Sequence, residues 1–277
     1  MENNELKNIV KEKYGEIANQ SKTQNETSCC GIGSSCCSGV DYTIFSENYT
    51  ELNGYNPDAD LGLGCGIPTE FALIKKGDTV VDLGSGAGND CFVSRALVGE
   101  TGKVIGIDFT ETMIEKAREN AEKLGFNNVE FRYGDIEKMP LTANKADVVI
   151  SNCVLNLVPD KKTAFKEIYR ILKVGGHFSI SDVVLEGILP AKLEQAAEMY
   201  AGCVSGAIQK QDYLEIIKAN GFKNVSVQKE KKITIPDEIL LNYITNSELD
   251  ELKHNNIGIF SITVYAEKTE CGSDCNC

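Results

Sequence analysis

Three cysteines from separate parts of the chain, Cys65, Cys153 and Cys203, have the most distinctive chemistry of any residues in the sequence. Cys65 is flanked by glycines within residues 61–66, so burial as a plain apolar side chain is an awkward explanation for it. Taken alone, Cys153 is most simply a small buried hydrophobe, as most free cysteines are. Thiolates are soft ligands, so three that converged through the fold would form a trigonal site for a soft acceptor.

A glycine-rich turn predicts a second ligand. Its candidate contacts are Asp82, Gly84, Ser85, Gly86 and Gly88. Asp108 ends the next apolar run about 20 residues later, where a carboxylate can accept hydrogen bonds from ribose hydroxyls. The glycines follow the pattern G-x-G-x-G and not the G-x-G-x-x-G that favours pyrophosphate, which points to an adenosyl ligand over a nicotinamide cofactor.

Four more residues are candidate contacts for the same ligand. Asp135 and Ile136 follow the third expected strand, where a carboxylate and an apolar side chain could hold the amino group and ring face of adenine. For Asp135, a surface carboxylate is nearly as good an explanation. Met113 is a weaker candidate, because a methionine at helical spacing with Ala117 is more often core. Asn152 ends the fourth expected strand beside Cys153, at the edge where ligands bind in open α/β sheets.

The elements that must position these residues alternate between strands and helices, which is typical of a parallel α/β sheet with right-handed crossovers. An amphipathic helix is expected over residues 6–17. Strands are expected at residues 79–83, 103–108, 129–133, 146–151 and 177–183. Helices are expected at residues 90–97, 111–124 and 161–172, the last of them stopped by Gly175 and Gly176.

The order of elements changes after Pro190. We expect a helical stretch through Met199 and Cys203, a helix at residues 211–220 and a strand at 225–235. A polar helical insertion at 237–252 then precedes a final strand at 257–266, and the last two strands form an antiparallel pair at the sheet edge. The expected parts are an N-terminal helix with a cysteine-rich segment (1–60), a nucleotide-binding core (61–188), a C-terminal region completing the sheet (189–268) and a cysteine-rich tail (269–277).

Composition narrows the class of protein. The chain has 277 residues, 42% of them hydrophobic, with a formal net charge of -13, which opposes binding to nucleic acid or to anionic membranes. No run approaches the roughly 20 apolar residues of a membrane span, and residues 1–20 are too charged for a signal peptide, so a cytoplasmic location is expected. Eleven cysteines in that compartment favour metal binding or redox chemistry over a disulfide framework. Only His177 and His254 are available, so a histidine general base is not expected.

The motifs together resemble the arsenite methyltransferases, class I methyltransferases that use S-adenosylmethionine, over roughly residues 14–268. The resemblance is carried by residues 64–66, 82–92, 151–157 and 202–203. It implies a Rossmann-like, doubly wound, seven-stranded sheet with the donor across the carboxyl ends of the strands. One departure is Leu63, because some family members carry tyrosine two residues before the first binding cysteine.

The resemblance also implies roles for the cysteines. In that family three cysteines bind trivalent arsenic, and by position these are Cys65, Cys153 and Cys203. A fourth, near the amino terminus, forms a disulfide during turnover, and by position it is one of Cys29, Cys30, Cys36 and Cys37. The spacing before Cys65 favours Cys36 or Cys37 without deciding between them. The helix position of Cys91 suggests packing.

The implied reaction is arsenic detoxification by methyl transfer to arsenite or its glutathione or other thiol conjugates. The arsenic lone pair would attack the sulfonium methyl group, and thioredoxin or glutathione would reduce the resulting disulfide. No resident metal cofactor is expected, because arsenic is the substrate. Cys271, Cys275 and Cys277 are candidates for metalloid capture, although dispensable thiols explain them equally well.

Two other functions fit parts of the pattern. One is a methyltransferase acting on a small carbon or nitrogen acceptor, in which the cysteines serve only structure. The other is a non-catalytic metalloid or zinc sensor, in which the nucleotide fold is vestigial. The intact glycine-rich turn argues against the sensor.

Overall fold

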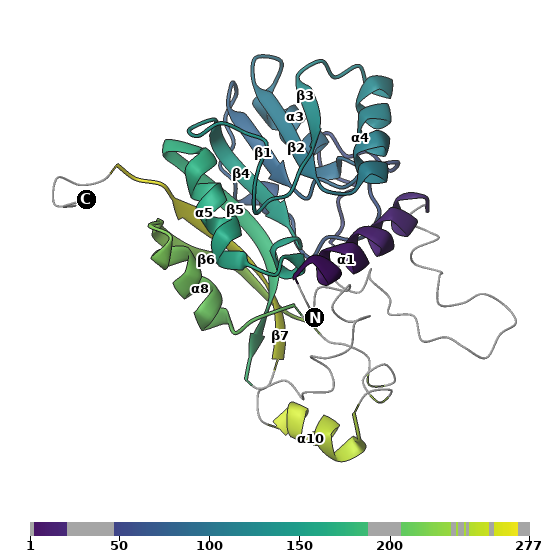
Figure 1. The fold of residues 1–277 in the computed structure, drawn as a ribbon, viewed down its shortest axis with the longest axis vertical. Helices are drawn as coiled ribbons and strands as arrows, with labels where there is room; N and C mark the ends of the chain where they lie inside the picture. Colours follow the sequence, from purple (N-terminus) through teal and green to yellow (C-terminus); the bar gives the residue numbers. More distant parts are fainter. Residues whose placement is uncertain are drawn as a thin grey trace, which may run out of the picture.

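A seven-stranded sheet with strand order β3-β2-β1-β4-β5-β7-β6 forms the centre of the computed structural model (Figure 1). The structure describes residues 3–20, 47–187, 206–233, 237, 241, 244–254 and 258–270. The strands are β1 (Thr79–Leu83), β2 (Lys103–Asp108), β3 (Val129–Tyr133), β4 (Ala146–Asn152), β5 (Leu172–Glu186), β6 (Lys223–Ile233) and β7 (Gly258–Glu267). The first five strands are parallel, and β7 runs antiparallel to both of its neighbours. The expected seven-stranded α/β sheet and its antiparallel final pair are therefore confirmed.

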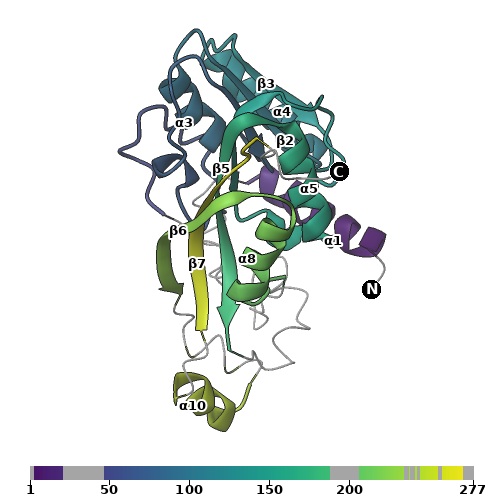
Figure 2. The ribbon, with the colours of Figure 1, turned by 90° about the vertical axis from the view of Figure 1, so that its left-hand side faces the viewer.

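Helices cover both faces of this sheet. The α-helices are α1 (Asn3–Ala18), α3 (Asn89–Val98), α4 (Glu111–Lys123), α5 (Lys161–Ile171), α8 (Lys210–Ala219) and α10 (Asn246–His254), and short 3-10 turns occur at η2 (Pro68–Glu70) and η3 (Leu155–Leu157). Figure 2 shows α3 and α8 on opposite sides of the sheet, and α10 beyond the end of β5 and β7. In the described part of the chain, no helix has the length and apolar character that crossing a membrane requires.

Alternation along the parallel strands builds two cores from one sheet, because successive side chains point to opposite faces. In β1, Val80 belongs to the buried cluster that includes residues of α1, α3 and α4, whereas Val81 belongs to the cluster that includes residues of α5 and α8. Both valines are fully buried. The strands are therefore covered on both faces, as expected for a doubly wound fold.

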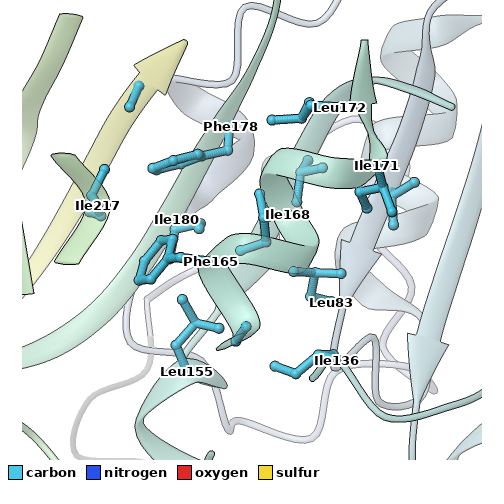
Figure 3. Packing of buried hydrophobic residues seen from close by; sticks show 14 of the residues in the cluster. Leu83, Ile136, Leu155, Phe165, Ile168, Ile171, Leu172, Phe178, Ile180 and Ile217 are labelled. Carbon is cyan, nitrogen blue, oxygen red and sulfur yellow. The ribbon is translucent and has the colours of Figure 1, made fainter. Parts of the chain in front are cut away.

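An aromatic cluster joins α5 and α8 to the sheet. Phe165 of α5 lies edge-on to Tyr213 of α8, with 5.6 Å between ring centroids. Phe178 of β5 lies edge-on to Phe222 at 4.9 Å. Figure 3 shows Phe165 and Ile168 on α5 facing the side chains of β5. Edge-to-face contacts of this kind add to the free energy gained from burial alone.

The glycine pair expected to stop the helix before β5 has a different role. Helix α5 ends at Ile171, and β5 begins at once with Leu172, whose backbone is already extended. Gly175 and Gly176 fall inside β5, where the pairing with β4 shifts between Leu172 and His177. Gly175 has a φ of 80° and donates its N–H to Lys268 O at 2.7 Å. The glycines thus form an irregularity within a strand, and the prediction of a helix stop was wrong.

The other boundaries agree closely with the sequence. The strands at residues 79–83, 103–108 and 129–133 have the expected ends, and β5 is longer than residues 177–183. Helix α10 begins at Asn246, inside the insertion expected at 237–252, and ends two residues beyond it at His254. The expected helical stretch through Met199 and Cys203 lies outside the described residues.

Phe165→Ala is expected to destabilise the protein by about 3–5 kcal/mol, because it removes a fully buried ring from the aromatic cluster. The free energy of unfolding would be measured by urea denaturation. Val174→Ala, at a side chain that is 52% exposed in the same sheet, is the control and should change stability by less than about 0.5 kcal/mol. Equal effects of the two substitutions would contradict this account of the core.

A buried carboxyl group makes stability depend on pH. Asp182 in β5 is fully buried and accepts hydrogen bonds from Tyr213 Oη at 3.2 Å and from the N–H of Val183 at 3.0 Å. Burial raises the pKa of Asp182 to about 7, although the nearby Lys161 charge and both hydrogen bonds act in the opposite direction. Because the unfolded carboxyl has a pKa of about 4, the folded state binds more protons between about pH 4 and pH 7. The contribution of Asp182 to stability therefore falls as pH rises through that window.

Asp182→Asn should flatten this pH dependence, since the amide cannot ionise. Urea unfolding of both proteins at about pH 5, 6 and 7 measures the difference. The free energy of unfolding of the wild type should decline relative to the variant as pH rises. A constant difference across the window would show that Asp182 has an ordinary pKa.

Candidate active site

A cavity lies at the carboxyl ends of β1, β2 and β4, where the topology brings the candidate residues together. Its lining includes nine of the ten residues expected to bind the nucleoside ligand: Asp82, Gly84, Ser85, Gly86, Asp108, Met113, Asp135, Ile136 and Asn152. Cys153 also lines the cavity. Gly88 does not. It precedes α3 with a φ of 101°, and a Cβ atom there would lie 2.9 Å from the rings of Phe92 and Phe131.

The glycine turn is held to β2 by Asp108. One carboxylate oxygen of Asp108 accepts the N–H of Gly86 at 3.0 Å, and the other accepts the N–H of Thr110 at 2.8 Å. Each oxygen has further acceptor capacity, so the carboxylate can also receive ribose hydroxyls. Gly84 has a φ of 64°, and a Cβ atom there would overlap the side chain of Val154. Glycine is therefore required at this turn for both backbone conformation and space.

Carboxyl groups concentrate negative charge in the cavity. Asp60, Asp82, Asp90, Asp108 and Asp135 all line it. Burial raises the pKa of Asp82 well above its usual range, with the nearby Asp90 charge adding to the effect, and burial also raises the pKa of Asp108. Burial raises the pKa of Asp90 to about 6, against the hydrogen bonds it receives from Asn152 and Tyr49. A cationic ligand would relieve this repulsion, as opposite charges do.

Cys153 lines this cavity, and Cys65, which does not, is paired with it. They are 88 residues apart in sequence, their Cα atoms are 5.7 Å apart, and their sulfurs are paired as a disulfide. Both side chains are buried. In the reduced state, two thiolates at this separation could bind a single soft ion together. Cys203, Cys36, Cys37 and the tail cysteines lie outside the described residues.

The backbone at Cys153 has an uncommon conformation. Its φ is 60°, in the left-handed region that few residues other than glycine adopt. The N–H of Cys153 donates to Ser181 O at 2.8 Å, which anchors this turn to the neighbouring strand β5. The conformation turns the chain from β4 towards η3 directly at the cysteine.

The side chain of Asn152 holds the loop that carries Cys65. Its Oδ1 accepts the N–H of Cys65 at 3.0 Å, and its Nδ2 donates to Gly66 O at 2.9 Å. The same Nδ2 lies 2.8 Å from Tyr49 Oη and 3.1 Å from Asp90 Oδ2. Asn152 was expected to bind the nucleoside ligand, and in this structure its amide is occupied by the cysteine loop.

Sequence reasoning missed several residues of the site. Asp90 follows the glycine turn closely, and that position could have suggested it. No local pattern marks Tyr49 or Tyr14, which reach the cavity only through the tertiary fold. Lys7 of α1 also lines the cavity, donates to Asp135 Oδ2 at 2.7 Å and contacts Glu137. The carboxylate of Asp135 is therefore paired with an N-terminal lysine.

Cys91 is separate from the two paired cysteines. It is fully buried in α3 and donates its S–H to Asp82 Oδ2 at 3.2 Å. Burial raises the pKa of the Cys91 thiol well above its ordinary value, and the Asp82 charge adds to the shift. This thiol is consequently a packing group with little thiolate character, as its helix position suggested.

Comparisons with known proteins agree with this geometry. A family model described as a methyltransferase domain matches residues 74–221. The arsenite methyltransferase of Halobacterium salinarum is 38% identical, and the alignment covers 95% of this chain and 67% of that protein. The arsenite methyltransferase of Aquipseudomonas alcaligenes is 33% identical, with coverage of 83% and 66%. The chain thus spans about two thirds of the length of these curated relatives.

A solved structure is similar in both fold and sequence. It is the crystal structure of an arsenic(III) S-adenosylmethionine methyltransferase from Chlamydomonas reinhardtii, which aligns with a TM-score of 0.62 and 32% sequence identity. The alignment covers 75% of this chain and 68% of that one.

Alkylation should distinguish Cys91 from the paired cysteines. After reduction, iodoacetamide is expected to label Cys153, which lines the cavity, in the folded protein while leaving Cys91 unmodified, because the Cys91 thiol lies outside the cavity lining and is protonated. Peptide mass spectrometry before and after unfolding in urea measures the difference. Labelling of Cys91 in the folded protein at the rate of Cys153 would show that α3 opens readily.

Proposed function

This chain belongs to the arsenite methyltransferase family, and we propose that it transfers methyl groups from S-adenosylmethionine to trivalent arsenic held by cysteine thiolates. The observation that carries the proposal is that Cys153, which lines the acidic cavity, is paired with Cys65. A thiol pair beside a nucleoside site supports a soft acceptor facing a cationic methyl donor.

The cavity suits the donor in both charge and hydrogen bonding. Asp108 can accept the ribose hydroxyls, and Met113 and Ile136 supply apolar contact for the adenine ring. Within the described part of the chain, Ser85 Oγ and Asn89 Oδ1 line the cavity, are buried and have no hydrogen-bond partner. Buried polar atoms are usually satisfied, so these two are suited to polar groups of the ligand. The carboxylates would stabilise the positive sulfonium and ammonium groups.

The acceptor needs no general base. Trivalent arsenic bound by thiolates of Cys65, Cys153 and Cys203 is pyramidal and carries a lone pair. This lone pair would attack the methyl carbon as the bond to the sulfonium sulfur breaks, and S-adenosylhomocysteine would leave with that bonding pair. Positioning supplies much of the acceleration in such a displacement. His177 has no part in it, because its Nε2 lies 2.6 Å from Ala72 O, outside the cavity lining.

Methyl transfer formally oxidises arsenic from the trivalent to the pentavalent state. Two electrons must return, and two thiols can supply them by forming a disulfide. We propose that Cys36 or Cys37 pairs with a binding cysteine in this step, and that thioredoxin or glutathione then reduces the disulfide. Arsenite, or its conjugate with glutathione or another thiol, is the proposed substrate.

Cys153→Ser should abolish most methylation of arsenite, because a hydroxyl is a poor ligand for a soft arsenic centre. Purified protein would be incubated with labelled S-adenosylmethionine, arsenite and glutathione, and the arsenic species separated by chromatography. We expect the wild type to form methylated arsenic and the variant to form about a hundredfold less of it. Binding of S-adenosylhomocysteine, measured by calorimetry, is the control and should persist in the variant.

Two results would contradict the proposal. If Cys153→Ser methylated arsenite as fast as the wild type, the thiolate mechanism would be wrong. If the wild type bound the donor but produced no methylated arsenic, the function would be wrong and carbon or nitrogen acceptors would be tested next.

A further inference from the structure

The loop carrying Cys65 is held by hydrogen bonds from three other parts of the chain. Asn152 at the end of β4 accepts from the N–H of Cys65 and donates to Gly66 O. Tyr49 Oη lies 2.9 Å from Gly66 O, and Ser261 of β7 donates its hydroxyl to Cys65 O. The backbone on both sides of the sulfur is therefore held in place.

The carboxylate of Asp90 accepts hydrogen bonds from two of these side chains. Tyr49 Oη lies 2.9 Å from its Oδ1, and Asn152 Nδ2 lies 3.1 Å from its Oδ2. Tyr49 can offer one proton and the Asn152 amide two. Four acceptors share these three protons: Gly66 O, the two carboxylate oxygens of Asp90 and Tyr49 Oη. An ionised acceptor strengthens such bonds, so the Asp90 charge orients both donors.

Steric contacts leave this loop little freedom. A Cβ atom at Gly64 would lie 2.5 Å from Asn152 Nδ2, and one at Gly66 would lie 2.5 Å from Ser181 Oγ. The loop thus packs its backbone directly against the amide of Asn152 and the side chain of Ser181. The O atom of Ser181 also accepts the N–H of Cys153, so the same strand residue contacts both cysteine segments.

We propose that Asp90 and Tyr49 are positioning residues for methyl transfer, which act through Asn152 to hold Cys65 beside Cys153 at the wall of the donor cavity. This inference rests on the proposed function and deepens it. Asp90 and Tyr49 also line the cavity, so the residues that fix the acceptor loop face the donor as well. The hydrogen-bonded side chains of Tyr49, Asn152 and Asp90 therefore line the donor cavity and also hold the loop that carries Cys65.

Tyr49→Phe tests the inference with the smallest change, since it removes only the hydroxyl that links Gly66, Asn152 and Asp90. Affinity for phenylarsine oxide, which binds two neighbouring thiols, should fall about tenfold in phosphine-reduced protein, because a charge-assisted bond is lost. The kcat for arsenite methylation should fall by a similar factor. Asp90→Asn, which removes the charge, should reproduce both losses.

The matched control is Tyr265→Phe. Tyr265 Oη also bonds a carboxylate, Glu267 Oε1 at 2.8 Å, but Tyr265 lies outside the cavity lining. It should bind phenylarsine oxide and turn over as the wild type does. An unfolding midpoint of Tyr49→Phe that is unchanged from the wild type would exclude a general loss of structure.

A second readout reports alignment of the two sulfurs directly. In a glutathione redox buffer, glutathione disulfide takes two electrons from the thiols of Cys65 and Cys153, which lose two protons, and leaves as two molecules of glutathione. The oxidised fraction, measured by peptide mapping, depends on how closely the folded protein holds the thiols. Tyr49→Phe should shift this equilibrium about tenfold towards the reduced form, and Tyr265→Phe should not shift it.

The outcomes separate this inference from the proposed function. If the wild type methylates arsenite and Tyr49→Phe matches it in kcat, phenylarsine oxide affinity and thiol equilibrium, the positioning role is wrong while the function stands. If the wild type makes no methylated arsenic but its affinity for phenylarsine oxide still depends on Tyr49, the proposed function fails while the loop is still positioned as described.

Discussion

The site depends on one side chain, the amide of Asn152, which joins the end of a central parallel strand to the loop carrying Cys65. Strand β4 ends at this residue, and Cys153 follows it in a left-handed backbone conformation. One short segment therefore both supplies a sulfur and holds the other. The rigid sheet fixes the position of Asn152, and the loop is held in position because it is hydrogen-bonded to Asn152. Sites supported by regular elements are positioned more precisely than sites on loops alone.

The acidic cavity follows from the same edge of the sheet. Parallel strands end together, so the carboxylates of Asp82 and Asp108 come close to Asp90 at the start of α3. Burial makes each charge costly, which is why their pKa values are raised. An enzyme whose donor carries a positive sulfonium gains from this arrangement, since the sulfonium supplies positive charge among these carboxylates.

Segments distant in sequence complete the site. Helix α1 reaches the cavity with Tyr14 and Lys7, and Lys7 pairs with Asp135. Strand β7 is inserted between β5 and β6, which brings Ser261 against the carbonyl of Cys65. The N-terminal helix thus helps to line the cavity, and the antiparallel C-terminal strands help to hold the loop of Cys65.

The sequence by itself determined the sheet, most of its strand boundaries and nine of the residues that line the cavity, because these follow from local patterns. The apolar runs alternate with helical segments at short range, and the glycine turn with Asp108 is a continuous motif. The same locality explains the error at Gly175 and Gly176. Glycines read as a helix stop in isolation, whereas the pairing of Leu172 and His177 with β4 on either side of them, and the bond from Gly175 to Lys268, place them inside a strand.

Only the tertiary structure decided which thiols meet and what holds them. Cys65 and Cys153 are 88 residues apart, so their contact depends on how β4 and the preceding loop pack. Tyr49 lies in no motif and becomes significant through hydrogen bonds to Gly66 and Asp90. The sequence predicted that Asn152 lies at the edge of the sheet where the cavity is found. It could not predict that the Asn152 amide bonds the backbone of the loop carrying Cys65. Hydrogen bonds between distant segments are short-ranged in space and independent of separation along the chain, so they become visible only when the chain is folded.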